Sequence, residues 1–551
     1  MRTLALLLAA CLAAPLFAAD YALPAGANEA ATKIDRASLE GPIRFLASDL
    51  LEGRGPATRG DELAQLYLAT EMQSIGLEPG GENGTWFQPF DIVGINSQVP
   101  KNWAFRTAKG QTVSLETWKD FIAASGVQNP QSTISNAEVV FVGYGIQAPE
   151  YQWDDFKKMD LKGKVLLMLN NDPDWDPKLF EGNRRLYYGR WTYKYESAAR
   201  QGAAGAIIIH TTPSAGYPWQ VVQTSWTGEQ FELPAEGEPR IEVAGWVTED
   251  AAKQLVSAAG RNLDQLIASA KNRKFKPVPL GITTSVTLQN TVSRKKTGNV
   301  LGLLRGSERP DEVVVYTAHH DHLGIGEPDA EGDRIYNGAL DNASGSAQVL
   351  AIARAFAALP QRPSRSILFN FVAAEEQGLL GSEYYAKHPT VHPGKMAANL
   401  NFDGANIWGR TTDIVQIGFG KNQLDDVVRH FATQQGRTIK PEQFPDRGFY
   451  YRSDQFNFAK IGVPAIYLDS GVDYRGRPEG WGKQQIEAWE AKQYHQPSDE
   501  IDASWNFEGL IEDARLGFFA GAAIAQMREM PAWNPGDEFE AARKKALAEA
   551  K

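Results

Sequence analysis

Two neighbouring segments, T-A-H-H-D-H-L-G at residues 317–324 and N-G-A-L-D-N-A-S-G at residues 337–345, indicate both the fold and the chemistry of this chain. The first follows the apolar run at residues 313–316 and places three histidines within four positions. A short run of valines is consistent with a buried strand, so the histidines stand where that strand ends. The second segment adds a carboxylate, Asp341, between small residues that allow a tight turn. Together the two segments predict a metal site at a strand end.

Strands and helices alternate regularly after these segments. Beyond the first strand, at 313–318, the pattern predicts strands at 367–373, 398–402 and 464–468, with helices at 343–357, 380–387, 422–434 and 507–527. Such alternation predicts an α/β fold with a mostly parallel mixed sheet and helices on both faces. In these sheets the ligand crevice lies beyond the carboxyl ends of the strands.

Further candidate metal ligands follow the later strands. Glu375 and Glu376 come after the second strand, Asp403 comes after the third, and His495 lies in the loop Y-H-Q-P-S-D-E. Two adjacent carboxylates repel each other unless a cation or a proton is present, so one as ligand and the other as general base is a natural division. The alternatives are a solvated loop for the glutamates and a helix cap for Asp341.

The clustered histidines are not equivalent. His319 and Asp321 point to the same side of an extended segment, so the carboxylate can orient the imidazole as metal-bound histidines usually require. Alternation sends His320 to the other face, and His322 is expected only at the rim. We therefore favour the non-ligand reading for His320 and His322.

The combined set favours two metal ions. It provides two histidines and three carboxylates for metal, with one further glutamate as a free base. Nitrogen and oxygen ligands without cysteine suit zinc, with manganese or cobalt as alternatives. Five protein ligands exceed what one tetrahedral catalytic zinc needs, so we expect two ions, about 3.5–4 Å apart, that share Asp341.

These motifs resemble the zinc aminopeptidase family that includes bacterial leucyl aminopeptidases and glutamate carboxypeptidase. The matching pieces occur in the family's order within 318–500: A-H-H-D-H-L-G, G-A-L-D-N-A-S-G, A-A-E-E-Q-G-L-L-G-S, N-F-D-G, R-S-D-Q-F-N-F-A-K-I-G-V-P-A and Y-H-Q-P-S-D-E. The segment L-A-S-D-L-L-E-G-R-G also resembles bacterial members. One departure is Gln455, where many bacterial relatives have histidine; we expect it to alter the pocket rim but not the metals.

The resemblance implies a role for each candidate. The implied metal ligands fall into two groups that share Asp341: His319 and Asp403 for one ion, Glu376 and His495 for the other. Glu375 would be the general base. Tyr494 stands where some relatives use a tyrosine to stabilise the oxyanion, with a packed aromatic as the alternative. The family also implies a strained peptide bond between Asp341 and Asn342.

The implied activity is that of an aminopeptidase, which hydrolyses N-terminal residues of peptides through a metal-activated bridging water. A carboxypeptidase or dipeptidase for acidic dipeptides would use the same metals and would need arginines, for which Arg447 and Arg452 could serve. A glutaminyl cyclase would use one zinc, which the five-ligand set disfavours. A receptor-like binding protein without activity would have no reason to retain all the ligand types.

The N-terminus resembles a secretory signal. Residues 1–19 carry Arg2, an apolar run too short to span a bilayer, and then small residues. We therefore expect an exported protein, periplasmic or secreted. Lipid attachment at Cys11, the only cysteine, is the less favoured alternative. No later segment reads as transmembrane.

The 551 residues exceed one ordinary domain. After the signal we predict an N-terminal part of the peptidase domain at 20–124, an inserted β-rich domain at 125–290, the catalytic domain at 291–535 and a charged helical tail at 536–551. The insert resembles the protease-associated domain of many family members. The net charge of −11 argues against a nucleic-acid partner, so peptides with a free N-terminus are the expected partners. The sequence predicts no oligomeric state.

Overall fold

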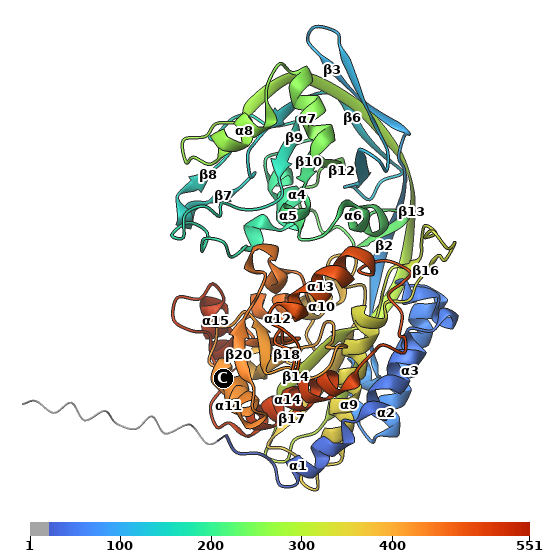
Figure 1. Cartoon of the computed structure of the whole chain (residues 1–551), viewed down its shortest axis with the longest axis vertical. Helices are drawn as coiled ribbons and strands as arrows, with labels where there is room; N and C mark the ends of the chain where they lie inside the picture. The colour runs from blue at the N-terminus through green and yellow to red at the C-terminus, as the bar shows by residue number, and fades with distance from the viewer. Residues whose placement is uncertain (1–20, 551) are drawn as a thin grey trace, which may run out of the picture.

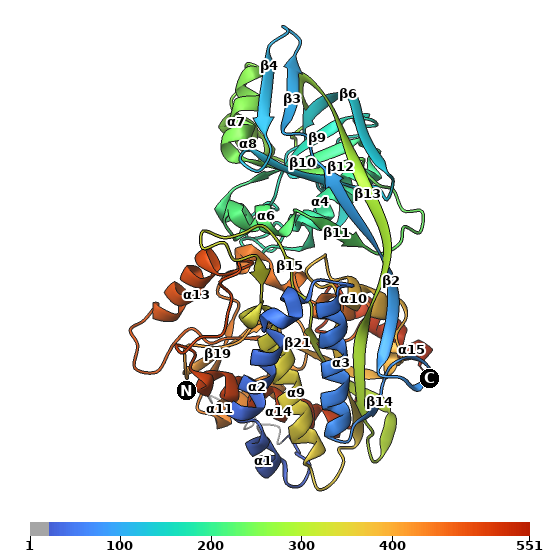
Figure 2. The same ribbon diagram turned by 90° about the vertical axis from the view of Figure 1, so that its right-hand side faces the viewer.

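The computed structural model describes residues 21–550; the predicted signal, with Arg2 and Cys11, lies outside the described residues. The chain forms a lower and an upper lobe (Figure 1). The upper lobe comprises the elements within residues 102–270, and the lower lobe comprises those within 21–84 and 309–550. Two long antiparallel strands, β2 (Phe87–Gln98) and β13 (Val278–Leu304), run from one lobe into the other (Figures 1 and 2).

The lower lobe is built on a sheet whose centre is parallel. Across the sheet the order is β20 (Thr438–Pro441), β19 (Asp413–Ile417), β21 (Ala465–Asp469), β18 (Met396–Asn401), β14 (Arg309–His319), β17 (Arg365–Val372) and the end of β13. The four strands from β21 to β17 run parallel, while β19 and β13 are antiparallel to their inner neighbours. The predicted mixed, mostly parallel α/β sheet is confirmed.

Helices cover both faces of this sheet. Val314, Tyr316 and Ala318 of β14 belong to the main core, with residues of α2 (Arg36–Leu46), α3 (Arg59–Ser74), α9 (Ser344–Ala357), α11 (Asp425–Gln434) and α14 (Phe507–Gln526). Val313 and Val315 belong to a second core with residues of α10 (Leu380–Lys387) and α12 (Gln455–Lys460). Because both faces are buried, the strand is a continuous apolar run and does not alternate with polar residues.

The upper lobe holds a second group of strands. Their order is β5 (Phe121–Ser125), β12 (Val243–Thr248), β10 (Gly205–His210), β9 (Val165–Leu169), β6 (Gln131–Phe141) and the first half of β13. The hairpin β3 (Asn102–Thr107) and β4 (Thr112–Glu116) joins this lobe through pairing of β3 with β13. Strand β11 (Glu229–Glu232) pairs instead with β2.

The upper lobe is more helical than the sequence pattern predicted. The insert was predicted to be β-rich, but the lobe also contains the helices α4 (Trp191–Arg200), α6 (Trp219–Ser225), α7 (Glu249–Ala258) and α8 (Leu263–Ala270). Helix α7 begins at an N-cap threonine and buries one apolar face, so its signal was present. Strands β3 to β5 begin before the predicted boundary at 125 and pack in this lobe. The division at 125 and 290 and the likeness to a protease-associated domain remain predictions.

The last helix is α15 (Glu540–Glu549), which contacts the segment Pro393–Lys395 of the lower lobe. Within residues 21–550, no helix has both the length and the apolar character needed to cross a bilayer.

Candidate metal centre

The predicted ligands come together beyond the carboxyl ends of the parallel strands. His319 ends β14, and the segments carrying Glu376 and Asp403 follow β17 and β18. Asp341 lies in the irregular segment before α9, and His495 follows α13 (Trp481–Lys492). Parallel strands end at one edge of the sheet, so residues distant in sequence meet there.

Asp341 lies between the two histidines. Its Oδ1 is 3.2 Å from Nε2 of His319, and its Oδ2 is 3.2 Å from Nε2 of His495. Asp403 Oδ1 lies 3.3 Å from the same nitrogen of His319, and Glu376 Oε2 lies 3.1 Å from that of His495. The side chains therefore form two groups that share Asp341. The peptide bond that follows Asp341 is cis.

Glu375 lies close to the first group. Its Oε2 is 3.9 Å from His319 Nε2, and Glu375, His319 and Asp403 offer ligand atoms within 4.8 Å of one another. His319, Asp341 and Glu376 form a second such triad. Distance alone therefore does not show which of the two glutamates is a ligand and which is a base. Their surroundings distinguish them.

The donor atoms fit divalent cations. Nε2 of His319 and Nε2 of His495 are buried and have no hydrogen-bond partner among the described residues. Several buried carboxylates close together need cations or protons to be stable. Imidazole nitrogens and carboxylate oxygens without thiolates are a donor set that suits zinc.

The surroundings shift the pKa values in opposite directions. Burial disfavours the charged form of His495, but nearby carboxylates, led by Glu376, outweigh this and raise its pKa to about 10. Burial, together with the negative charges of Asp403 and Glu376, raises the pKa of Glu375 well above its usual value. For Glu376, burial is outweighed by the imidazoles of His495 and His322, which lower its pKa to about 2. Glu376 is thus held as a carboxylate, whereas Glu375 is inclined to take a proton.

Asp321 contacts both His319 and the turn that carries Glu375 and Glu376. Its carboxylate accepts hydrogen bonds from the backbone N–H groups of Glu375 at 3.0 Å and Glu376 at 3.3 Å. Its Oδ1 is 3.7 Å and its backbone oxygen 3.3 Å from Nδ1 of His319. The predicted support of the imidazole is therefore shared between carboxylate and backbone, and the support of the turn was not foreseen.

Two supporting residues were missed from the sequence. The buried guanidinium of Arg54 donates to the backbone carbonyls of Leu46, His320, Asn337 and Gly338. Asp499 accepts from the backbone N–H groups of Leu340 and Asp341, each at 3.0 Å. Both residues lie in motifs that resemble the family, L-L-E-G-R-G and Y-H-Q-P-S-D-E. These motifs were the only sequence signal that could have identified them. Both act on backbone groups, which residue patterns do not reveal.

Two predictions, which placed His322 and Gln455 at the rim of the pocket, were wrong. His322 is buried, with Nδ1 2.6 Å from Oε1 of Glu376. Gln455 is also buried; it donates to the backbone oxygen of Tyr450 and accepts from Asn401. Both side chains lie in the protein interior because the segments that carry them are covered by the lower lobe. His320 lies away from the ligands, with Nε2 3.8 Å from Asp61, as alternation predicts.

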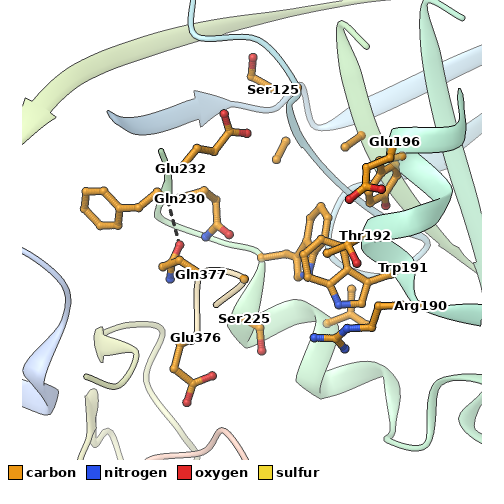
Figure 3. Close-up of a pocket in the computed structure, with 18 of the residues that line it drawn as sticks. Ser125, Arg190, Trp191, Thr192, Glu196, Ser225, Gln230, Glu232, Glu376 and Gln377 are labelled. Carbon is orange, nitrogen blue, oxygen red and sulfur yellow. Dashed lines mark hydrogen bonds between the residues drawn. The ribbon is translucent and has the colours of Figure 1, made fainter. Parts of the chain in front are cut away.

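Two cavities open onto the ligands. The larger, of about 370 Å³, lies between the lobes and is lined by residues that include Arg190, Trp191, Ser225 and Glu376 (Figure 3). His495 also lines it. The smaller, of about 150 Å³, is lined in the lower lobe by residues that include Asp341, Asp403, Trp408, Phe449 and Trp489. Their walls share Glu375, Glu376, Arg452 and Tyr494.

Tyr494 lies where the two cavities meet. Its ring is 4.0 Å, centroid to centroid, from that of His495, and its hydroxyl accepts a hydrogen bond from Arg452 Nη2 at 3.0 Å. Burial raises the pKa of Tyr494 well above its usual value, so the phenol remains protonated and can donate. The side chain is thus both packed against a ligand and exposed to the cavities.

A mostly parallel α/β sheet with buried histidines and carboxylates at its carboxyl edge is the arrangement of the zinc exopeptidase fold. Residues 299–517 match Peptidase family M28. This part of the chain is therefore similar to that family.

Known proteins resemble the chain over different lengths. Leupeptin-inactivating enzyme 1 from Streptomyces exfoliatus is 29% identical over 265 residues, which is 47% of this chain and 55% of that protein. Aminopeptidase NAALADL1 from Rattus norvegicus is 34% identical over 394 residues, or 62% of this chain and 46% of that protein. The chain thus spans about half the length of these curated relatives. The solved structure of an aminopeptidase from Aneurinibacillus sp. strain AM-1 shares the fold, with a TM-score of 0.54 and 19% identity over 93% of this chain and 97% of that one.

Proposed function

We propose that this chain is an aminopeptidase that holds two zinc ions and hydrolyses N-terminal residues from peptides. The observation that carries the proposal is the position of Asp341, whose two oxygens each face a different histidine at 3.2 Å. A carboxylate in this position can be shared by two ions. The match of residues 299–517 to Peptidase family M28 supports peptides as substrates.

The distances support two ligand groups. His319, Asp341 and Asp403 would hold one ion, and Asp341, Glu376 and His495 would hold the other. When bound, zinc would lower the pKa of a shared water and polarise the scissile carbonyl; manganese or cobalt would supply the same chemistry.

Glu375 is the proposed general base. Its raised pKa, caused by burial and neighbouring carboxylates, suits a group that accepts the proton of the attacking water and holds it. It lines both cavities and so has access to substrate. It would then deliver the proton to the amine that leaves.

Tyr494 is proposed to stabilise the oxyanion that forms at the scissile carbonyl. Its protonated hydroxyl is held by Arg452 at 3.0 Å and lines both cavities. A preorganised donor of this kind lowers the barrier only where negative charge develops.

The cavities suggest how a peptide binds. Aromatic and aliphatic walls of the smaller cavity, formed by Trp408, Phe449, Ile486 and Trp489, would take an apolar N-terminal side chain. The carboxylates beside it would receive the α-ammonium group. The rest of the peptide would extend into the larger cavity between the lobes.

Hydrolysis of a panel of aminoacyl-p-nitroanilides tests this function. Each substrate would be offered with and without an N-terminal blocking group, before and after a chelator, and with zinc restored. Cleavage confined to unblocked substrates, lost with chelator and restored by zinc, is expected. The absence of cleavage of every unblocked substrate by protein that holds two zinc ions per chain would refute the aminopeptidase assignment.

A carboxypeptidase for acidic dipeptides is the second candidate, favoured by two arginines. Arg190 and Arg452 both line the larger cavity, and within the described part of the chain neither has a carboxylate at ion-pair distance. Arg447, considered from the sequence, is instead paired with Glu490. Cleavage of N-blocked acidic dipeptides, with no cleavage of free aminoacyl substrates, would select this candidate.

We also propose export, on the pattern of residues 1–19. A periplasmic or secreted protein would begin near residue 20 after processing, which intact-mass measurement of protein from each cell fraction would test. A lipid-modified Cys11 would give a different mass and membrane association.

A further inference from the structure

The upper lobe reaches the candidate metal centre through helix α6. Ser225 is the last residue of this helix, and its Oγ lies 2.7 Å from Nδ1 of His495. Figure 3 shows Ser225 in the wall of the larger cavity, together with Glu376. A residue of one lobe thus makes a hydrogen bond to a candidate ligand of the other.

The chemistry of imidazole gives this contact a direction. His495 turns Nε2 toward Asp341 and Glu376, so that nitrogen needs a free lone pair to bind metal. The hydrogen then lies on Nδ1, which donates to the Ser225 oxygen. Metal-bound histidines usually have such an acceptor, which fixes the tautomer and the orientation of the ring.

The two candidate histidines obtain this support from different places. His319 has Asp321, two residues away in its own segment, opposite Nδ1. For His495, Ser225 is the only hydrogen-bond partner of Nδ1 among residues 21–550. One half of the site is therefore supported within the lower lobe, and the other half across the lobe boundary.

Neighbouring contacts join the upper lobe to the same half of the site. Gln220 of α6 donates to the backbone oxygen of Ala491 at 2.9 Å, close to His495 in sequence. The backbone N–H of Phe231 donates at 2.9 Å to the side-chain oxygen of Gln377, which follows Glu376. Both segments that carry the ligands of the second group are thus held by the upper lobe.

We propose that Ser225 is a positioning residue through which the upper lobe completes the metal position formed by Glu376 and His495. The position formed by His319 and Asp403 depends on the lower lobe alone. This inference rests on the proposed two-metal function and specifies how one of the two positions is built.

Zinc titration of the full-length mature chain tests the proposal. Zinc-free protein would be titrated against a chelating indicator, for the wild type, Ser225→Ala, Ser225→Thr and Thr227→Ala. Thr227 supplies the matched control, because among residues 21–550 its hydroxyl bonds only to the backbone oxygen of Gln223 in α6. Ser225→Thr retains a hydroxyl at the position.

The expected result is selective weakening of one zinc. In Ser225→Ala the zinc at the position formed by Glu376 and His495 should lose about 10- to 100-fold in affinity, because loss of the partner of a ligating histidine usually has an effect of this size. The other zinc should keep its wild-type affinity, and kcat should fall more than KM rises at limiting zinc. Ser225→Thr should recover most of the affinity, and Thr227→Ala should match the wild type.

Three results would overturn the proposal. Wild-type affinity for both zinc ions in Ser225→Ala would show that the contact does not position His495. Equal weakening of both ions, or the same loss in Thr227→Ala, would indicate a general effect of lobe packing. A wild-type chain that binds fewer than two zinc ions would instead refute the two-metal function on which the inference rests.

Discussion

Glu375 and Glu376 are neighbours in sequence, yet their surroundings separate them. Imidazoles lower the pKa of Glu376 to about 2, while burial and nearby carboxylates raise that of Glu375 well above normal. We predict that Glu375→Gln lowers kcat by about 10²- to 10⁴-fold, the usual contribution of a positioned base. KM and zinc content should stay near wild-type values, since the variant removes a proton acceptor and no metal ligand.

Steady-state kinetics and metal analysis on the same preparation would check this prediction. Glu383→Gln is a suitable control, because Glu383 lies on α10 and pairs with Lys387. Near-normal turnover by Glu375→Gln, or loss of zinc from it, would falsify the assignment of Glu375 as base.

Tyr494 allows a sharp test between two roles. Tyr494→Phe keeps the ring against His495 and removes only the hydroxyl held by Arg452. If the hydroxyl stabilises the oxyanion, kcat should fall by about 10- to 10³-fold with little change in KM. Unchanged kcat would leave Tyr494 as a packed aromatic side chain.

At the scale of single residues, sequence reasoning identified candidates that the fold brings together. They were detectable because each stands directly after a strong strand or in a distinctive motif, as with His319 and Asp403. Ser225 and Asp499 were not identified, since they support the site through hydrogen bonds over long sequence separations. Such contacts depend on how elements pack, and no local pattern encodes them.

Arg54 ends the short helix η2 (Asp49–Arg54) and holds several elements together. Its buried guanidinium donates to four backbone carbonyls, including those of His320 and Gly338. An unsatisfied buried polar group costs about 1–3 kcal/mol. We therefore predict that Arg54→Leu lowers the free energy of unfolding by at least about 3 kcal/mol.

Urea unfolding followed by fluorescence would measure the effect of Arg54→Leu. Arg59→Gln removes an exposed arginine from the start of α3 and should change stability little. Arg54→Lys should remain destabilised, because an ammonium group lacks the planar fork that reaches several carbonyls. Equal stability of Arg54→Leu and Arg59→Gln would show that the hydrogen bonds of Arg54 to the four backbone carbonyls do not stabilise the fold.

His210 ends strand β10 and gives the upper lobe a pH dependence. Burial lowers its pKa to about 4, although its ring contacts the backbone oxygen of Tyr217 at 3.1 Å. The unfolded histidine, with a pKa of about 6.5, binds a proton before the folded one does. Stability from this group is therefore fully present above about pH 6.5 and is lost as the pH falls towards 4.

Between pH 7 and pH 5 the protonation of His210 should lower the free energy of unfolding by about 2 kcal/mol. His210→Gln cannot take up the proton, so its unfolding free energy should fall less than that of the wild type over the same range. Urea unfolding at the two pH values would compare them. The same pH dependence in both proteins would show that His210 does not control it.

At the scale of elements, the sheet was predictable and the connections were not. Central strands such as β14 are continuous apolar runs because both faces are covered, so their pattern is strong. Strand β13 was missed as one element, since its middle pairs with β2 between the two lobes and carries polar residues such as Lys295 and Lys296. Away from a buried sheet, the apolar pattern that identifies a strand is absent.

For the whole molecule, the sequence indicated a catalytic part and an insert but not how the lobes meet. The lobes meet through hydrogen bonds such as the one between His495 and Ser225 and the one from the Phe231 backbone N–H to Gln377. These polar contacts leave no periodic pattern in the sequence. Lobe docking and one half of the proposed zinc site are nevertheless linked, because Ser225 contacts His495.

Zinc should therefore stabilise the whole molecule. Bound cations offset the buried carboxylates of the site, and a ligand present at about 1,000 times its Kd stabilises the folded state by about 4 kcal/mol. We predict that chelation lowers the unfolding temperature measured by calorimetry and that added zinc restores it. Asp341→Asn removes the shared carboxylate, so the difference between zinc-loaded and chelated protein should shrink. An identical unfolding temperature for zinc-loaded and chelated wild type would mean that the cluster contributes no metal-linked stability, against the proposed two-metal centre.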